Sequence, residues 1–253
     1  MFFISLFESN LRIKNFSQKI IYYNSTDSTN DDIWKLYNET NEQDIAVITD
    51  DQKKGRGRSD NKWFSKPGHS ITCSFLLKEI FPREKFNLHS ILIPVAVIQG
   101  IKNFLSVDLS IKWPNDIMYE NKKLGGILIE SKMNDQAILN IGLGLNVNEN
   151  SIDFPPELQK KSISLKEIKG YPIQREPLLA SIFDALDFLI ENIDASTIIE
   201  YWMNHCSHKD KKVEFINNQN SISGIFKNIN QKGQAVINYN NKYIEYDGVI
   251  NII

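Results

Sequence analysis

The sequence predicts an α+β fold, in which a mixed, mainly antiparallel sheet is flanked by helices and followed by a small β-barrel. Residues 110–146 consist of short apolar stretches separated by tight polar turns, which is typical of antiparallel hairpins. Longer segments with apolar residues at helical spacing occur on both sides of this region. After Lys209, short strands alternate with polar turns and scattered glycines, the pattern of a small barrel.

The length and composition fit this organisation. The chain has 253 residues, enough for one large domain or for a large domain and a small one. We place a boundary after Ser207, which gives domains of residues 1–207 and 208–253. Hydrophobic residues make up 42% of the chain, enough for a substantial core, and the formal net charge of −2 argues against bulk attraction to nucleic acid.

The N-terminal residues and the low cysteine content favour a cytoplasmic location. The first four residues are apolar, but no basic segment precedes them, and Glu8 and Arg12 soon follow. We therefore expect neither a signal peptide nor a membrane span at this end. The two cysteines, Cys73 and Cys206, cannot form a disulfide framework and suit a reducing compartment.

Three strands and one helix are predicted in the first third of the chain. Residues 19–23 are β-branched and aromatic, which indicates a strand. A helix follows, with Ser28 or Thr29 as its N-cap and Ile33, Trp34, Leu36 and Tyr37 at helical spacing. Residues 45–49 and 70–77 predict two further strands, and the second of these places Cys73 on a core face.

A buried helix and a set of hairpins are predicted next. Residues 88–105 are apolar throughout, and Pro94 either lies in the first turn of a helix that starts late or kinks one that starts early. The hairpin strands are residues 110–113, 117–119, 123–131 and 136–146. Glycines at positions 125, 126, 142 and 144 interrupt two of them, which indicates either bulges or a ligand lying across the sheet.

Two helices and four short strands are predicted in the last third. Residues 177–193 form an apolar helical stripe that opens with Pro177, and residues 197–204 form a second helix. His205, Cys206 and His208 can bind metals, but no further ligands accompany them, so we expect an ordinary helix end. The late strands are predicted at residues 213–215, 222–229, 234–239 and 242–246.

The loop Gly55-Arg56-Gly57-Arg58 is the strongest candidate for a binding element. Glycine lets a ligand approach the main chain, and arginine offers a fork of donors to carboxylate or phosphate oxygens. A solvated surface turn is the alternative. Lys112 and Lys123 flank a hairpin whose turn holds Asp116, so cations and a carboxylate meet in a plausible site for phosphate and magnesium.

Two common nucleotide-binding motifs are missing from the sequence. It contains neither G-x-x-x-x-G-K-[ST] nor a G-x-G-x-x-G after a strand. The residues alone therefore indicate an enzyme or a binding protein for a small acidic ligand, with or without a nucleotide.

Five motifs resemble those of biotin protein ligases, and the match runs from about Ser25 to Asn148. The resemblance implies the class II synthetase-like fold of biotin and lipoate ligases, with a small C-terminal SH3-like β-barrel. The motifs are Asp27-Ser28-Thr29-Asn30, Gly55-Arg56-Gly57-Arg58 with Trp63, Lys112-Trp113-Pro114-Asn115-Asp116, the segment from Lys123 to Glu130, and the segment from Gly142 to Asn148.

The resemblance implies a two-step reaction. Such ligases join biotin to ATP, giving biotinyl-5′-adenylate and pyrophosphate, and then pass biotin to a lysine of a carrier. Magnesium and cationic side chains would reduce the repulsion between the carboxylate and the phosphates. The implied partner is the biotin carboxyl carrier domain of acetyl-CoA carboxylase or of a similar enzyme, with no membrane partner and with a monomer or homodimer as the working form.

The resemblance also implies a role for each motif residue. The implied catalytic residues are Arg56, Arg58, Lys112 and Lys123. The implied biotin-binding residues are Ser28, Thr29, Asn30, Gln52, Gly55, Arg56, Gly57, Arg58, Lys123 and Gly126. The implied adenylate-binding residues are Arg58, Trp63, Lys112, Asn115, Asp116 and Asn146, with Asp116 also on the metal, while Trp113 is expected to serve packing.

Several features depart from the family pattern. Ser59-Asp60-Asn61 stand where relatives commonly carry glycine and arginine, and His69-Ser70 where a small residue and asparagine are frequent. Bifunctional members carry an N-terminal winged-helix domain. Only about two dozen residues precede the Ser28 motif, too few for such a domain, so we expect a monofunctional ligase without DNA as a partner.

Two rival functions remain open. A lipoate- or octanoate-transferring enzyme would share the fold, although the arginine loop together with Lys112–Asp116 favours biotin. A biotin-responsive regulator without catalysis is the second rival, and the retained lysines argue against it.

Overall fold

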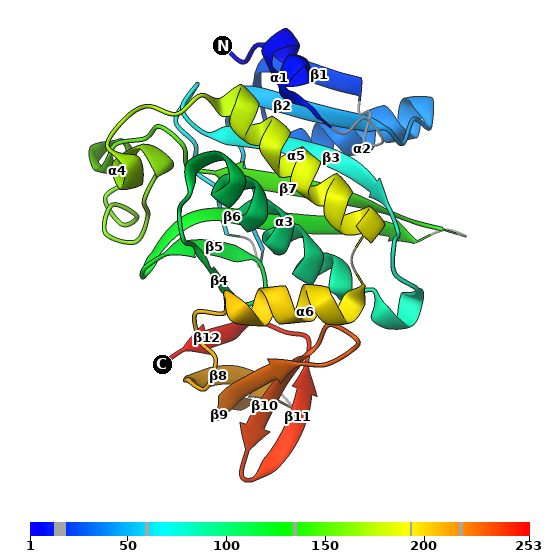
Figure 1. Cartoon of the computed structure of the whole chain (residues 1–253), viewed down its shortest axis with the longest axis vertical. Coiled ribbons are helices and arrows are strands. Elements are labelled where there is room, and N and C mark those ends of the chain that lie inside the picture. Colours follow the sequence, from blue (N-terminus) through cyan, green and yellow to red (C-terminus); the bar gives the residue numbers. More distant parts are fainter. Residues whose placement is uncertain (13–18, 59–60, 134–135, 193, 218–219) are drawn as a thin grey trace.

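The computed structural model describes residues 1–12, 19–58, 61–133, 136–192, 194–217 and 220–253. Residues 134–135, which lie between two predicted hairpin strands, are outside these ranges, as is residue 193, the last residue of the helix predicted at 177–193. Two of the residues that depart from the family pattern, Ser59 and Asp60, are also outside them. The described residues form a seven-stranded and a five-stranded sheet, which occupy the upper and lower parts of the view in Figure 1.

The large sheet confirms the predicted mixed, mainly antiparallel arrangement. Its strands, in spatial order, are β1 (Lys19–Thr26), β2 (Ile45–Gln52), β3 (Ile71–Lys78), β7 (Ala137–Leu145), β6 (Lys122–Met133), β5 (Asp116–Tyr119) and β4 (Ser110–Lys112). β1 and β2 pair in parallel, and the other neighbouring strands pair antiparallel over their described residues. The parallel pair follows from α2 (Thr29–Thr40), a crossover helix that returns the chain to the end where β1 began.

Helices cover both faces of this sheet, because alternate residues of each strand point to opposite sides. Ala46 and Ile48 of β2 belong to the main core, whereas Ile45 and Val47 pack in a second cluster with Ile33 of α2. The main core includes residues of α3 (Leu88–Leu105), α5 (Arg175–Asn192) and α6 (Ala195–Asn204), which lie together on one face in Figure 1.

The predicted buried helix, α3, lies at the centre of the main core. It starts at Leu88, so Pro94 lies inside it rather than in its first turn. Its length and composition would suffice for a membrane span, but 72% of it is buried inside the protein. Gly100 lets α5 approach closely, since a Cβ there would lie 2.5 Å from the Cα of Ile182.

Some elements differ from the prediction. α5 starts two residues earlier than expected, which leaves Pro177 in its first turn, where its missing N–H costs nothing. The short elements α1 (Ile4–Asn10), α4 (Leu165–Lys169) and β12 (Ile250–Ile252) were not predicted. Each is shorter than the stretch over which a periodic hydrophobic pattern can be recognised, and α1 is defined by its packing against α5.

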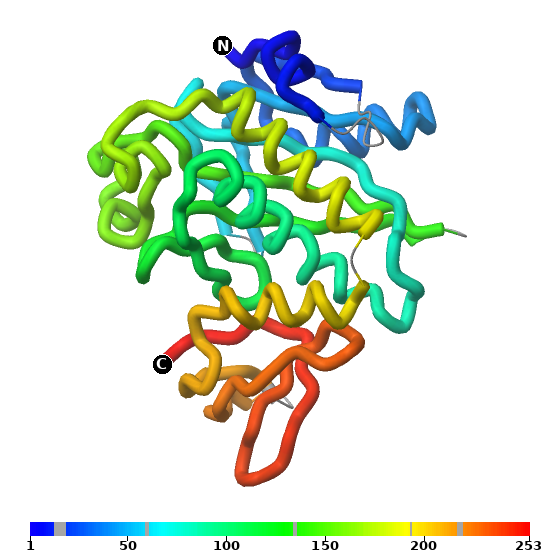
Figure 2. The backbone as a smooth tube through the Cα atoms, viewed as in Figure 1, coloured from blue at the N-terminus to red at the C-terminus, as the bar shows by residue number. Residues whose placement is uncertain are grey.

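The second sheet is formed by the last strands. In spatial order these are β11 (Lys242–Tyr246), β10 (Ala235–Tyr239), β9 (Asn220–Ile229), β8 (Lys212–Asn217) and β12. Figure 2 shows the last, red part of the chain running back alongside α6 to pair with β8. The SH3-like character of this sheet and the domain boundary after Ser207 stay predictions.

Aromatic rings join the two sheets. Phe226 of β9 is fully buried, with its ring centroid 4.4 Å from that of His208 and 6.0 Å from that of Trp113. Trp113 Nε1 donates to the carbonyl of Gly248 at 2.9 Å, and Trp202 Nε1 donates to that of Pro114 at 3.3 Å. Trp113 therefore serves packing, as predicted, although its edge also reaches the cavity described below.

Replacing Phe226 by alanine should lower the free energy of unfolding by about 3–5 kcal/mol, because a large buried ring is lost and a cavity remains between the sheets. Urea denaturation measures this directly. Tyr243→Ala in the same sheet removes a ring that is 69% exposed and should cost less than about 1 kcal/mol. Equal losses for the two variants would contradict a shared aromatic core.

Candidate functional site

A cavity of about 420 Å³ opens where the N-terminus of α2, the Gly55–Arg58 loop, the β4–β5 turn and the strands β6 and β7 meet. All of the predicted site residues except Gly55 line it. Side chains from five separate stretches of sequence thus converge on one space. This convergence is what a binding site requires and a solvated surface turn would not produce.

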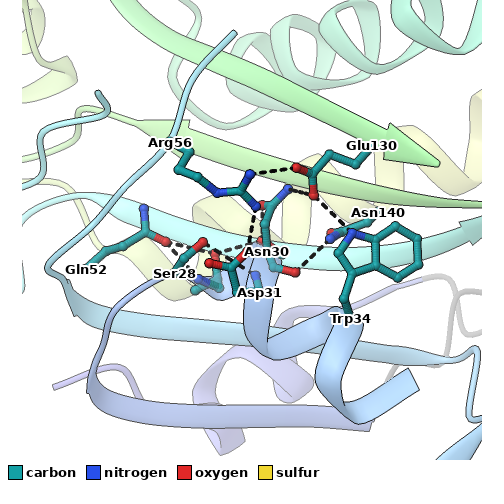
Figure 3. A network of polar contacts seen from close by, with 10 residues as sticks. Ser28, Asn30, Asp31, Trp34, Gln52, Arg56, Glu130 and Asn140 are labelled. Carbon is teal, nitrogen blue, oxygen red and sulfur yellow. Dashed lines mark hydrogen bonds and ion pairs between the residues drawn. The ribbon is translucent and has the colours of Figure 1, made fainter. Parts of the chain in front are cut away.

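The first end of the cavity is a network of neutral hydrogen-bonding groups. Ser28 caps α2, and its hydroxyl accepts from the Asp31 backbone N–H at 3.4 Å. The backbone N–H of Thr29 donates to Gln52 Oε1 at 2.9 Å, and Thr29 Oγ1 lies 2.7 Å from Ser74 Oγ. Ser28, Thr29 and Asn30 are all buried, so these polar atoms are fixed in orientation (Figure 3).

The glycines of β7 make room for protein side chains. A Cβ at Gly142 would overlap the amide of Asn30, and a Cβ at Gly144 would overlap the indole ring of Trp63. The side chains of Asn30 and Trp63, which both line the cavity, therefore pack against the sheet at these positions. The prediction left open bulges or a ligand lying across the sheet. At Gly142 and Gly144 the approaching groups are protein side chains, and the pairing of β7 shows no bulge at these positions.

The arginine loop folds back on itself. The Trp63 N–H donates to the Gly55 carbonyl at 2.9 Å, and the Gly57 N–H donates to the Asn61 carbonyl at 2.7 Å. A Cβ at Gly55 would lie 2.6 Å from the Trp63 carbonyl oxygen, so this position needs glycine. The structure gives Gly55 a place in the turn and not in the cavity wall.

The second end of the cavity is cationic, and its charges differ in their partners. Lys123 pairs with Asp116 at 2.6 Å, whereas Arg56 reaches back to the α2 side, where it forms ion pairs with Asp31 at 2.6 Å and with Glu130 at 3.0 Å. In the described part of the chain, neither Arg58 nor Lys112 has an ion-pair partner. Burial lowers the pKa of Arg58, and the nearby charge of Asp116 opposes that shift. This end therefore favours an anion.

Two polar atoms of the wall lack partners. Trp63 Nε1 and Asn146 Oδ1 are buried, and no described residue forms a hydrogen bond with either. Asn146 Nδ2 donates to the Ile163 carbonyl at 3.1 Å, so the side-chain oxygen of Asn146 points away from that carbonyl. Buried polar atoms are normally satisfied, so these two are exceptions among the residues that line the cavity.

The described residues do not favour a cysteine nucleophile or a cluster of metal ligands as the functional centre. Cys73 is buried in the core as predicted, and burial raises the pKa of its thiol to about 12. His208 is buried, and desolvation together with the charge of Lys112 lowers its pKa to about 4. Among the described residues there is no group of three or more His, Cys, Asp or Glu side chains that could hold a metal ion.

Several lining residues were not predicted. They include Phe64, Phe154, Leu158 and Ser162 from loops, and Val249, Ile250 and Asn251 from the end of the chain. The last three reach the cavity because β12 pairs with β8 and the Trp113 indole holds Gly248. Only the tertiary arrangement brings these residues to the site, and no local signal in the sequence marks them.

Comparison with known proteins identifies the sequence family. Residues 22–148 match the model of the biotin/lipoate A/B protein ligase family. The bifunctional ligase/repressor BirA of Bacillus spizizenii is 35% identical over 174 residues, which cover 68% of this chain and 54% of that protein. BirA of Escherichia coli is 28% identical over 230 residues, covering 88% and 68%. The chain thus spans about half the length of the Bacillus relative.

Solved structures share the fold over almost the whole chain. A biotin protein ligase from Aquifex aeolicus in complex with biotin and ATP has a TM-score of 0.75 and 26% identity, covering 93% of this chain and 98% of its own. A mutant biotin protein ligase from Aquifex aeolicus in complex with biotin has a TM-score of 0.78 and 24% identity, covering 94% and 99%.

Gly144→Ala should lower the free energy of unfolding by about 1–3 kcal/mol, because the new methyl group overlaps the Trp63 ring. Most of this loss should disappear in a Trp63→Ala background, where the ring is gone. Urea denaturation of the two single variants and the double variant gives the coupling energy. Purely additive losses would show that Trp63 does not rest on Gly144.

Proposed function

The chain belongs to the biotin/lipoate A/B protein ligase family, and we propose that it is a biotin protein ligase that activates biotin with ATP and transfers it to a carrier protein. One observation carries the proposal: a single cavity joins a fixed network of neutral hydrogen-bonding groups to a cluster of cations. Biotin has the matching form, with a ureido ring system at one end and a carboxylate at the other.

The neutral end suits the ureido group. A urea offers two N–H donors and a carbonyl acceptor, which require partners of both kinds in fixed positions. Ser28, Thr29, Asn30 and Gln52 supply hydroxyl and amide groups there. Gly126 lines the same cavity close to Lys123 and Asp116, where its backbone would meet the rest of the biotin molecule. Biotin binding by these residues is the first part of the proposal.

The cationic end suits the reacting groups. A carboxylate oxygen of biotin attacks the α-phosphorus of ATP, the bond to the β-phosphate oxygen breaks, and pyrophosphate leaves. Arg58, Lys112 and Lys123 would stabilise the anionic oxygens during this step. The carrier lysine then attacks the acyl carbon as a neutral amine, AMP leaves, and the amine loses a proton.

Magnesium fits this end in a limited way. Asp116 offers one carboxylate, beside Asn115, and Mg²⁺ is commonly bound by one or two carboxylates together with phosphate oxygens and waters. Mg²⁺ would neutralise phosphate charge when bound. Trp63 and Asn146 would meet the adenine side, since both residues line the cavity.

The polar character of the first end favours biotin over lipoate. A dithiolane ring has no hydrogen-bond donors, so it would leave buried hydroxyl and amide groups of this end without partners, at a cost of about 1–3 kcal/mol each. We further propose a biotin carboxyl carrier domain as the acceptor and the cytoplasm as the compartment, with neither DNA nor a membrane as a partner.

Pyrophosphate release from ATP and Mg²⁺ tests the proposed function, with biotin, lipoate or octanoate added in turn and a biotin carboxyl carrier domain as acceptor. We expect release only with biotin, and a mass increase of the carrier equal to one biotinyl group. Faster release with lipoate would assign the chain to the other branch of the family. Tight biotin binding without release would make it a binding protein.

Lys123→Ala should slow pyrophosphate release by about a hundredfold or more, since it removes a preorganised donor to the reacting oxygens. Lys123→Arg should not restore the rate fully, because a planar fork cannot replace a compact ammonium group. Lys122→Ala is the matched control, since its side chain is exposed and does not line the cavity. If Lys123→Ala folds normally and reacts at the wild-type rate, Lys123 is a solvated strand-end charge, worth at most about 1 kcal/mol.

A further inference from the structure

Glu130 of β6 connects the two walls of the cavity without lining the cavity itself. Its carboxylate forms an ion pair with Arg56 Nη1 at 3.0 Å, and it accepts hydrogen bonds from Trp34 Nε1 at 3.0 Å and from Asn30 Nδ2 at 3.3 Å. Figure 3 shows these groups gathered around one side chain. The donors come from the arginine loop and from α2, which are distant in sequence from β6.

Arg56 is held on both sides by this arrangement. Its Nη2 lies 2.6 Å from Asp31 Oδ1 at the start of α2, while its Nη1 reaches Glu130. Two carboxylates therefore neutralise Arg56, whereas Arg58, two residues further on, forms no ion pair with any described residue. The first arginine anchors the loop, and this leaves the second one as a charge for a ligand.

Asn30 is held by the same carboxylate. Its Nδ2 donates to Glu130, its Oδ1 accepts from Ser74 Oγ at 2.6 Å, and its backbone carbonyl accepts from Asn140 Nδ2 at 2.9 Å. The orientation of the Asn30 amide is therefore fixed at the neutral end of the cavity. Glu130 sets the position of a head-group residue and of the loop at once.

We propose that Glu130 is a positioning residue, which couples the arginine loop to the biotin head-group wall through Arg56 and Asn30. This inference rests on the proposed function. Since Glu130 does not line the cavity, it acts on binding by holding other groups in place. The ion pairs are partly exposed, with side-chain exposures of 44% for Arg56 and 26% for Glu130, so their loss should free the loop without unfolding the protein.

Glu130→Gln should raise the KM for biotin about tenfold while kcat changes by less than about twofold, because a loop that is no longer preorganised must be ordered by the ligand. Steady-state pyrophosphate release measures both constants. Glu42→Gln is the matched control: it removes one exposed ion pair, Lys19–Glu42 at 3.4 Å, at a residue outside the cavity lining, and it should change neither constant. An unchanged KM in Glu130→Gln would overturn the proposal.

A double-mutant cycle separates coupling from a merely structural role. If Glu130 acts mainly through Arg56, the variant with both Arg56→Gln and Glu130→Gln should have nearly the same KM for biotin as Arg56→Gln alone. Multiplication of the two single effects would mean that Glu130 acts independently of the loop. That outcome would also overturn the proposed coupling.

Hydrogen exchange of the ligand-free protein tests the anchoring without any enzymatic readout. Amides of residues 54–58 should exchange faster in Glu130→Gln than in the wild type or in Glu42→Gln. Unchanged exchange would overturn the anchoring even if the chain is a biotin ligase. Faster exchange in a protein whose wild type releases no pyrophosphate with biotin would instead overturn the proposed function and leave Glu130 as a loop anchor only.

Discussion

The rest of the site depends on two glycines of β7, Gly142 and Gly144, because two side chains pack directly against the backbone there. Asn30 lies over Gly142 and Trp63 lies over Gly144, each where a Cβ would overlap it. Asn30 belongs to the first turn of α2, and Trp63 ends the arginine loop. Both walls of the cavity therefore take their position from the absence of side chains on a central strand, and any larger residue would push a wall away from the sheet.

Neutral polar groups and charged groups lie in different parts of the cavity. Hydroxyl and amide groups occupy the end beside α2, whereas Arg58, Lys112 and the Lys123–Asp116 pair occupy the other. The loop contributes to both ends, because Arg56 is neutralised by Asp31 and Glu130 while Arg58 is not paired within the described residues. The two arginines of this loop look equivalent in the sequence but differ in their contacts, since two carboxylates hold Arg56 while Arg58 lines the cavity without an ion pair to any described residue.

Much of the fold could be predicted because hairpins are local. The strands between residues 110 and 146 follow from alternating apolar stretches and polar turns, and α3 follows from its apolar length. The parallel pairing of β1 and β2 agrees with the helix predicted between them, whereas the arrival of Val249 at the cavity depends on tertiary packing, so no local pattern indicates it. The motif residues were found from the sequence, but their partners were not: nothing in the spacing of Arg56 and Glu130 indicates an ion pair.

We propose that one end of the cavity binds a carboxylate while the other binds a polar head group. Titration calorimetry with biotin and with biotin methyl ester tests it most directly, because the ester keeps the head group and loses only the charge. We expect biotin to bind at least about tenfold more tightly, as loss of a charge-assisted hydrogen bond requires. Equal affinities would contradict the assignment of Arg58 and Lys123 to the carboxylate, and the absence of binding by either compound would contradict the site itself.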